Sequence, residues 1–437
     1  MFSQLLRSTS KAVNSASMTS SLLPGMASTR AASKRPGPAP ASGRDAVIVT
    51  ARRTPILPIG GAYKHMTASD LGALVIKDVA NTAGIAHAEI QEVYMGNVLQ
   101  AGQGQAPARQ ALVKAGLPFT VPATTVNKVC ASGMKALQMA SQAIMLGHRS
   151  CMVAGGMESM SQVPHYLMDL RKGLPYGHSQ AVDGVINDGL WDAYNDIHMG
   201  QIGEHCAREM GFSREEQDDY AIESYKRAQA AINENMLLDE VCVVAIPERK
   251  GEPTIVRDDA NPFRVKFDKV RKIPTVFDPS PNGTITAANA SSVDDGAAAL
   301  LLMSAQKAEE SAVKPMARVI GMADTAVEPI NFPIAPVSAV RAALDMAKLS
   351  VKDIDFWEIN EAFSVVMLAN MKLLELDHAR VNVFGGAVSM GHPIGCSGAR
   401  IVGTLAHVLQ KKDAKYGVAA ICNGGGGASA VVIERLN

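Results

Sequence analysis

The sequence lacks the features that would place a chain of 437 residues in a specialised class. Its 42 basic residues balance 42 acidic ones, so the composition favours neither nucleic acid nor a membrane surface as a partner. No uninterrupted apolar run reaches the roughly 20 residues that span a bilayer. With 47% hydrophobic residues, the composition predicts a soluble globular protein of two or three domains.

Cysteine pairs are also missing. Six cysteines are scattered along the chain, and no two of them form a CxxC pair: Cys130, Cys151, Cys206, Cys242, Cys396 and Cys422. This pattern is neither that of a disulfide scaffold nor that of a zinc site, and it fits a protein of a reducing compartment.

The first 44 residues contain no Asp or Glu. Basic residues such as Arg7 and Lys11 lie among many Ser and Ala, beside a predicted apolar helix face that includes Phe2 and Leu5. This acid-free, amphipathic composition is typical of a mitochondrial transit peptide and predicts delivery to the matrix, with a disordered tail as the alternative. The proline-rich residues 34–43 are predicted to be a linker, so residues 1–44 form no part of the predicted fold.

The remaining chain predicts an α/β protein. Short apolar runs predict strands at 46–50, 93–98, 124–129, 151–154, 319–320, 356–359 and 418–421. Helical patterns predict helices at 68–80, 105–115, 132–146, 214–234, 337–347 and 362–374. Because strands alternate with helices, we expect a parallel sheet covered on both faces. Residues 162–282 break this rhythm and are predicted to be an inserted loop domain.

The end of the chain resembles its middle. Cys130-Ala131-Ser132-Gly133 opens a predicted helix, which leads to a strand that ends in Gly155-Gly156. Cys396-Ser397-Gly398-Ala399 opens another predicted helix, which leads to a strand followed by glycines. This likeness predicts an internal duplication, with halves at 45–310 and 311–437 and with sites where the halves meet.

Cys130 lies where an apolar run gives way to a helical pattern. Unpaired N–H groups and the positive end of the helix dipole at such a junction favour thiolate over thiol. A single cysteine is more often a buried structural residue, but the small residues Ala131, Ser132 and Gly133 leave room for a ligand. We therefore take Cys130 as a candidate covalent nucleophile.

Three further stretches carry potentially reactive groups. Asn360 follows a predicted strand, at the carboxyl end where open α/β sheets bind ligands. His392 lies in the glycine-rich segment 385–395, and Cys422 ends a predicted strand before the glycines at 424–427, whose N–H groups can point at an oxyanion. Each signal is weak alone. Together, a nucleophile, a base, a second thiol and amide donors suit carbon–carbon chemistry at a thioester.

Four segments resemble the signature blocks of the thiolase family, in the same order: 127–134, 360–363, 391–393 and 422–426. The resemblance covers the chain after the leader and implies the thiolase fold, with duplicated βαβαβαββ halves in α/β/α/β/α layers and an inserted loop domain. It implies an acyltransferase that performs the reversible thiolysis of acetoacetyl-CoA without a redox cofactor. His198-Met199 resembles the short-chain branch of the family, and Phe332-Pro333 resembles members that also accept 2-methyl-branched substrates.

The resemblance also implies a role for each catalytic position. Cys130 is expected to be acylated, and His392 to take the proton of Cys130 and later that of coenzyme A. Cys422 is expected to move the proton at the substrate's α-carbon. His392 and a water held by Asn360 would form one oxyanion hole, and the N–H groups of Cys130 and Gly424 the other.

Binding sites and an assembly follow from the same resemblance. Coenzyme A is expected near ten residues: His198, Met199, Tyr225, Arg264, Val265, Lys266, Lys269, Ser291, Phe332 and Pro333. A potassium ion is expected at Tyr225, the carbonyls of Ala287, Ala288 and Ala290, and Val388. Hard carbonyl oxygens suit an alkali cation. The implied partners are acyl-CoA substrates and further copies of the chain, in a homotetramer built as a dimer of dimers.

Three other functions share some of these features. A β-ketoacyl synthase has a similar architecture, but it usually combines cysteine with two histidines, where this chain has Cys422. A catalytically silent acyl-CoA-binding relative should have lost Cys130 or His392, and both are present. A cysteine hydrolase would leave the glycines beside Cys422 unexplained.

Overall fold

Strand β12 (Asp294–Ser304) is buried along its whole length and lies in the interior of the main sheet. In this computed structural model the described residues are 37–39, 41–248 and 251–437, and residues 37–437 form one unit. Most of the predicted transit peptide, residues 1–36 and residue 40, lies outside the described part. Alternate residues of β12 face opposite ways: Leu301 and Met303 pack in one apolar cluster, and Leu300 and Leu302 pack in another.

The main sheet has ten strands, in the order β14-β15-β16-β13-β1-β12-β5-β3-β4, with β2 (Leu57–Pro58) paired to β12. The other strands are β1 (Ala46–Arg53), β3 (Glu92–Gly96), β4 (Ala123–Val126), β5 (Cys151–Ser159), β13 (Ala317–Ala326), β14 (Phe356–Ile359), β15 (Tyr416–Asn423) and β16 (Gly427–Arg435). β3 is parallel to β4 and β5, and β14 is parallel to β15, whereas the other pairs are antiparallel.

The sheet is therefore mixed, and the prediction of a parallel sheet was wrong. β15 turns directly into β16 through a short glycine turn. Because no helix separates these two strands, the alternation of strands and helices could not indicate that they pair antiparallel. The predicted end of β5 was also wrong, since Gly155 and Gly156 lie inside the strand. At these positions an added Cβ would lie within 2.2 Å of backbone atoms, so glycine here serves close packing rather than a turn.

The two halves of the sheet repeat one strand order. In the first half the order from the edge is β4-β3-β5-β12-β1. In the second, an isolated bridge from Val381 to Trp357 takes the place of the edge strand, followed by β14-β15-β16-β13. The halves join where the first residues of β1 pair with the first residues of β13.

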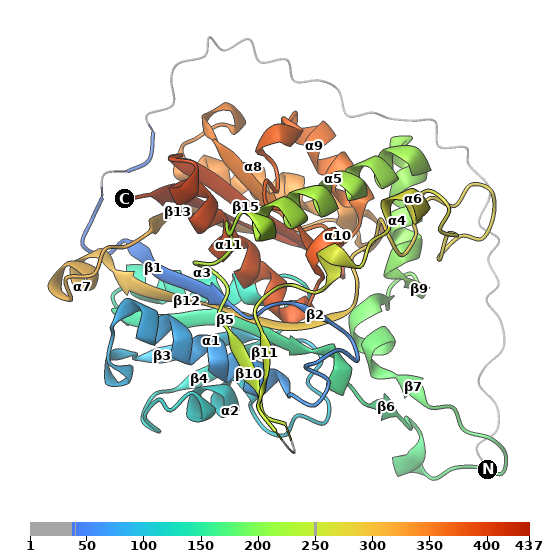
Figure 1. Cartoon of the computed structure of the whole chain (residues 1–437), viewed down its shortest axis with the longest axis horizontal. Coiled ribbons are helices and arrows are strands. Elements are labelled where there is room, and N and C mark those ends of the chain that lie inside the picture. Colours follow the sequence, from blue (N-terminus) through green and yellow to red (C-terminus); the bar gives the residue numbers. More distant parts are fainter. Residues whose placement is uncertain (1–36, 40, 249–250) are drawn as a thin grey trace, which may run out of the picture. The chain divides into compact units, whose positions relative to one another are not determined.

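Helices form three layers around these halves (Figure 1). Between the halves, α3 (Ser132–Met145) and α11 (Ile394–Lys411) pack against each other. The outer face of the first half carries α1 (Ala68–Ala83) and α2 (Pro107–Lys114). The outer face of the second carries α8 (Ala335–Ala347) and α9 (Ser364–Leu374). This is the predicted α/β/α/β/α order of layers.

The segment between β5 and β12 includes residues 162–282, for which an inserted loop domain was predicted. It holds α4 (Met199–Met210), α5 (Arg214–Asn233) and α6 (Phe267–Val270), with short hairpins β6 (His165–Tyr166)–β7 (Val182–Asp183), β8 (Trp191–Asp192)–β9 (Ile197–His198) and β10 (Val244–Ile246)–β11 (Thr254–Val256). The prediction of α5 is confirmed, and its capping box of Ser213 and Glu216 fixes its start. α4 was missed because its cap is His198, which is not a usual capping residue.

Two further short α-helices are α7 (Ala305–Glu310) and α10 (Ala387–Met390). Among the residues that the structure describes, none of the helices combines the length and apolarity needed to cross a membrane.

Candidate active site

Cys130 lies between β4 and α3, two residues before the helix begins. It lines a cavity of about 350 Å³. The preceding Val129 has φ +48°, which is rare for a β-branched residue. The cavity is lined by Cys130, Met160, Ile186, Gly189, Leu190, His198, Met199, Val276, Phe277, Ala290, Ser291, Ser292, Val293, Phe332, Ala362, Phe363, His392 and Gly424.

Cys130 is a thiol at neutral pH. Burial raises its pKa to about 11, although the N–H groups of Gly424 and of Cys130 itself lie at the sulfur and lower it. The prediction that the helix start makes Cys130 a thiolate was therefore wrong for the free protein, because desolvation outweighs two N–H donors. Gly424 begins the turn between β15 and β16, in which Gly425 and Gly426 both have φ +82°.

His392 lies two residues before α11, just as Cys130 lies two residues before α3. The two halves thus present these side chains from corresponding places, and the predicted alignment of Cys130 with Cys396 was wrong. Gly391, the residue before His392, has φ +116°, and a Cβ there would lie 2.4 Å from the carboxylate of Asp294. That carboxylate accepts a hydrogen bond from the His392 N–H at 2.9 Å, so this loop requires glycine.

The ring of His392 is held through one nitrogen and leaves the other without a partner among the described residues. Its Nδ1 lies 2.6 Å from the Ser397 hydroxyl, which donates to the Pro393 carbonyl at 2.9 Å. Because a hydroxyl has one proton, we assign the ring proton to Nδ1. The buried Nε2 has no hydrogen-bond partner among the described residues. Burial and the nearby Arg400 lower the pKa of His392 to about 3, so the imidazole is neutral.

Asn360 and Cys422 do not line the cavity. Asn360 follows β14, and both polar atoms of its buried side chain lack a partner in the described part of the chain, which is the usual mark of a bound water or ligand. Cys422 lies near the end of β15, in one apolar cluster with Met199 and Phe332. Burial strongly raises the pKa of Cys422, and the Cys130 thiol adds to the shift.

Four residues expected to contact coenzyme A line the cavity: His198, Met199, Ser291 and Phe332. The ring of His198 stacks on Phe277, with 4.7 Å between centroids. Phe277 and Met160 were not predicted as site residues, since an isolated apolar residue carries no signal of its place in a site. Phe363 belongs to the signature segment 360–363, but its place in the cavity lining was not predicted. Pro333 lines a separate hollow of about 50 Å³.

The remaining predicted contacts lie elsewhere. Arg264 and Lys266 are exposed just before α6, Lys269 is exposed within it, and none of the three lines the cavity. Val265 packs against Tyr225 and Val388, which share one small apolar cluster. Ala287, Ala288 and Ala290 lie in the loop before β12, and of these three only Ala290 reaches the cavity.

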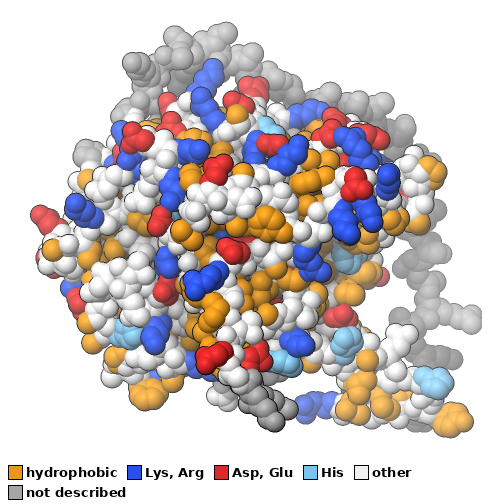
Figure 2. Space-filling view, viewed as in Figure 1, with side chains coloured by type: hydrophobic (Ala, Val, Ile, Leu, Met, Phe, Trp, Pro, Cys, Tyr) orange, Lys and Arg blue, Asp and Glu red, His pale blue; other side chains and the backbone are white. Residues whose placement is uncertain are grey.

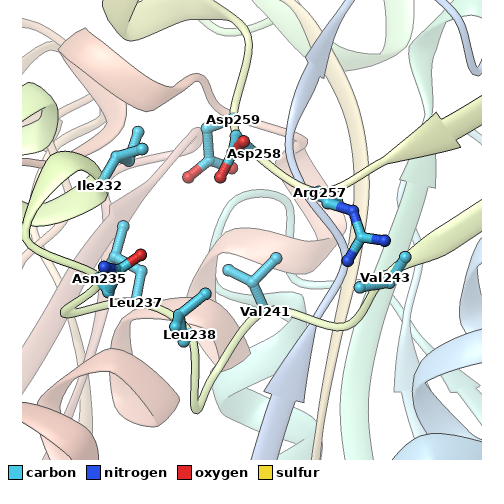
Figure 3. A pocket seen from close by; sticks show the side chains of 9 residues that line it. All are labelled: Ile232, Asn235, Leu237, Leu238, Val241, Val243, Arg257, Asp258 and Asp259. Atoms are coloured by element: carbon cyan, nitrogen blue, oxygen red, sulfur yellow. The ribbon is translucent and has the colours of Figure 1, made fainter.

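A second hollow, of about 70 Å³, lies between the end of α5 and the β10–β11 hairpin (Figure 3). It is lined by Ile232, Asn235, Leu237, Leu238, Val241, Val243, Arg257, Asp258 and Asp259. It shares no residue with the cavity at Cys130. Its buried carboxylate, Asp259, is already paired with Arg53 at 2.7 and 2.8 Å, so we assign no chemistry to it.

Comparison with known proteins defines the class. The family model described as "Thiolase, N-terminal domain" matches residues 46–306, and the model described as "Thiolase, C-terminal domain" matches residues 313–435. The chain therefore belongs to the thiolase family, as predicted.

Individual relatives are similar over most of their length. The mitochondrial acetyl-CoA acetyltransferase of Xenopus tropicalis is 54% identical over 392 residues, which is 90% of this chain and 92% of the relative. The Homo sapiens protein of the same name is 54% identical over 394 residues, covering 90% and 91%. Among solved structures, the Acat5 thiolase of Ascaris suum in complex with coenzyme A matches with a TM-score of 0.86 and 44% identity, over 90% of this chain and 100% of that one. This match confirms the predicted fold.

Proposed function

We propose that this chain is an acetyl-CoA acetyltransferase, which cleaves acetoacetyl-CoA with coenzyme A and catalyses the reverse condensation. Relatives of that name are 53–54% identical over 90% of the chain. The observation that carries the proposal is the pair at the cavity. Cys130 has two backbone N–H groups at its sulfur, and His392 has a neutral ring with an unpartnered Nε2. These are a nucleophile with its oxyanion donors, and a base.

In the first half-reaction, Nε2 of His392 takes the proton of Cys130, and the thiolate attacks the 3-keto carbon of acetoacetyl-CoA. The bond between C2 and C3 then breaks, and its electron pair passes to the enolate of acetyl-CoA. Cys422 protonates the enolate carbon, the imidazolium proton of His392 passes to Cys422, and an acetyl group stays on Cys130. In the second half-reaction His392 takes the thiol proton of coenzyme A. The new thiolate removes the acetyl group, and the proton returns to Cys130.

The two anions form on different oxygens, so each needs its own donors. The N–H groups of Cys130 and Gly424 serve the tetrahedral oxyanion. His392 and a water held by Asn360 serve the enolate, and the unpartnered amide of Asn360 supports such a water. Loss of one oxyanion donor costs about 3 kcal/mol in enzymes where it has been tested, which is large enough for separate sites to matter.

The direct test is to label the enzyme. Brief exposure to acetoacetyl-CoA should leave one acetyl group on the peptide that contains Cys130, seen by mass spectrometry, and Cys130→Ala should leave none. A label on Cys422 would reverse the assigned roles. A wild-type enzyme that turns over with no acetylated cysteine would exclude this mechanism.

Coenzyme A is the proposed acyl carrier, and acyl-CoA esters are the proposed substrates. The Ascaris suum relative is described as a complex with coenzyme A. The apolar cavity walls suit the thioester arm, and Ser291 offers a hydroxyl in the lining. The exposed cations Arg264, Lys266 and Lys269 are placed in one segment and suit the phosphates of the nucleotide.

A potassium ion fits the loop before β12. The carbonyl oxygens of Ala287, Ala288 and Ala290 accept no hydrogen bond from the described residues. Such unpaired oxygens are suitable ligands for a hard cation, with Tyr225 and Val388 as the further ligands. When bound, the ion would supply charge that fixes the loop from which Ser291 reaches the cavity.

Further copies of this chain are the proposed partners, in a tetramer. The β6–β7 arm carries exposed apolar side chains at Leu167, Met168, Leu170, Leu174 and Tyr176. Figure 2 shows hydrophobic side chains gathered on this arm, at the lower right of the view. Gathered apolar exposure of this kind marks an interaction surface.

The mitochondrial matrix is the proposed location. Several relatives at 53–54% identity are named mitochondrial. The acid-free, amphipathic composition of residues 1–44 supports the same conclusion.

A further inference from the structure

We propose that Lys128 is a positioning residue, which ties the loop that carries Cys130 to strands β13 and β16, beside the turn that carries Gly424. The inference rests on the proposed acyl transfer through Cys130. The contacts of the Lys128 side chain lie outside the cavity, and in this inference they set the spacing between the N–H groups of Cys130 and Gly424.

Lys128 joins the two halves of the protein. Its ammonium group donates to Asp324 Oδ1 at 2.5 Å, to the Ser429 hydroxyl at 2.8 Å and to the Ala428 carbonyl at 3.3 Å. All three protons of the ammonium are therefore used. Asp324 belongs to β13, and the other two acceptors belong to β16. Ala428 pairs in register with Cys422 across β15 and β16, close to the turn that begins at Gly424.

The backbone beside Lys128 is held in an unusual shape. Val129 has φ +48°, and β-branched residues adopt this conformation only when their surroundings impose it. The N–H of Lys128 donates to the Ser132 hydroxyl at 2.8 Å, and that hydroxyl donates to the Val129 carbonyl at 2.6 Å. These bonds shape the loop itself. Bonds within the loop cannot fix its distance from the second half of the protein. The hydrogen bonds of the Lys128 side chain fix that distance.

Lys135, which lies in α3, provides a matched control because it pairs with the same carboxylate. Its ammonium binds the other oxygen of Asp324, at 2.7 Å. The side chains of Lys128 and Lys135 are similarly exposed, at 24% and 29%. Among the described residues, Lys135 makes no hydrogen bond to β16, and it lies five residues from Cys130, so Lys135→Met removes a comparable charge and ion pair without releasing the Cys130 loop.

The experiment compares Lys128→Met, Lys128→Arg and Lys135→Met with the wild-type enzyme. The carbonyl stretch of ¹³C-acetyl on Cys130, measured by infrared difference spectroscopy, reports how strongly the two N–H groups hold the acyl oxygen. We expect Lys128→Met to raise this frequency and to lower kcat by about tenfold or more, because one oxyanion donor is displaced. KM for coenzyme A should change by less than about threefold, since Lys128 does not line the cavity.

Lys135→Met should keep the wild-type frequency, and kcat within about twofold, because it leaves the loop contact intact. Lys128→Arg keeps the bond to Asp324 and should recover most of the rate. If Lys128→Met matches Lys135→Met in both frequency and kcat, Lys128 is only a surface ion pair and the inference is wrong. If Lys128→Met does not fold, the rate and the frequency of Lys128→Arg decide together: a rate and a band that are both unchanged, or a loss of rate that comes with a raised frequency, support the inference, and a large loss of rate with an unshifted band overturns it. A wild-type enzyme without acetyl on Cys130 would instead remove the proposed function.

Discussion

The protonation state of Cys130 gives the most direct test of the site. Its pKa of about 11 means that roughly one molecule in 10⁴ carries a thiolate at pH 7, against a few per cent for an unperturbed cysteine. The thiolate fraction is therefore lower by a factor of about 300. A more basic thiolate is a better nucleophile, by roughly tenfold over this range of pKa, so the net deficit in alkylation rate is about 20- to 30-fold.

The assay is alkylation by iodoacetamide, followed at the Cys130 peptide by mass spectrometry between pH 6 and 9. Because this range lies below the raised pKa, the thiolate fraction and hence the rate should rise tenfold with each pH unit, without a plateau. His392, with a pKa near 3, does not titrate in this range and should add no inflection. Cys130→Ala measures the background from the five other cysteines, which are all buried.

A plateau beginning below pH 8 would refute this reasoning. It would mean that a thiolate–imidazolium pair exists in the free enzyme and that the N–H donors outweigh desolvation. The variant His392→Asn distinguishes the two states further. If the free enzyme holds a neutral pair, the variant leaves the slope of alkylation rate against pH unchanged. If it holds an ion pair, the variant shifts the pH profile of alkylation to higher pH.

Four other predictions concern the second thiol, the substrate, the leader and the core. Cys422→Ser should slow carbon–carbon cleavage by about 10²-fold or more while acetyl exchange between Cys130 and coenzyme A slows far less; equal losses would make Cys422 structural. The enzyme should cleave 2-methylacetoacetyl-CoA with a kcat/KM within about a hundredfold of that for acetoacetyl-CoA, with and without potassium, and Phe332→Leu or Pro333→Gly should alter only that ratio. A reporter fused to residues 1–44 should enter mitochondria, and replacing Arg7 and Lys11 by Glu should keep it in the cytosol. Asp259→Ala should lower the free energy of unfolding by about 3–5 kcal/mol in chemical denaturation. The reason is that Arg53, whose side chain is only 2% exposed, loses one of its two carboxylate partners. A loss below about 1 kcal/mol would contradict a buried pair.

The sequence by itself determined the parts of this protein whose signals are local. The apolar runs and helical patterns located β1, β14, α1 and α8 within a few residues of their true bounds. The short motifs around Cys130, His392 and Cys422 identified the family before any contact was known. Such motifs persist in the sequence because the chemistry needs those residue types at those turns. A local signal also lies at Pro393, whose fixed φ directs the chain into α11 at the next residue.

Only the tertiary structure decided the features that depend on contacts between distant segments. The mixed order of the sheet follows from antiparallel pairings that the local pattern does not show: β16 returns beside β15 through a short turn, and β12 returns beside β5 only after the long insertion. The thiol form of Cys130 follows from desolvation by a cavity whose walls come from the insertion and from both halves. The equivalence of Cys130 and His392 appears only when the true helix starts are known. The contact from Lys128 to Ala428 spans 300 residues, and a local pattern cannot contain it, because burial and pairing are properties of the packed chain.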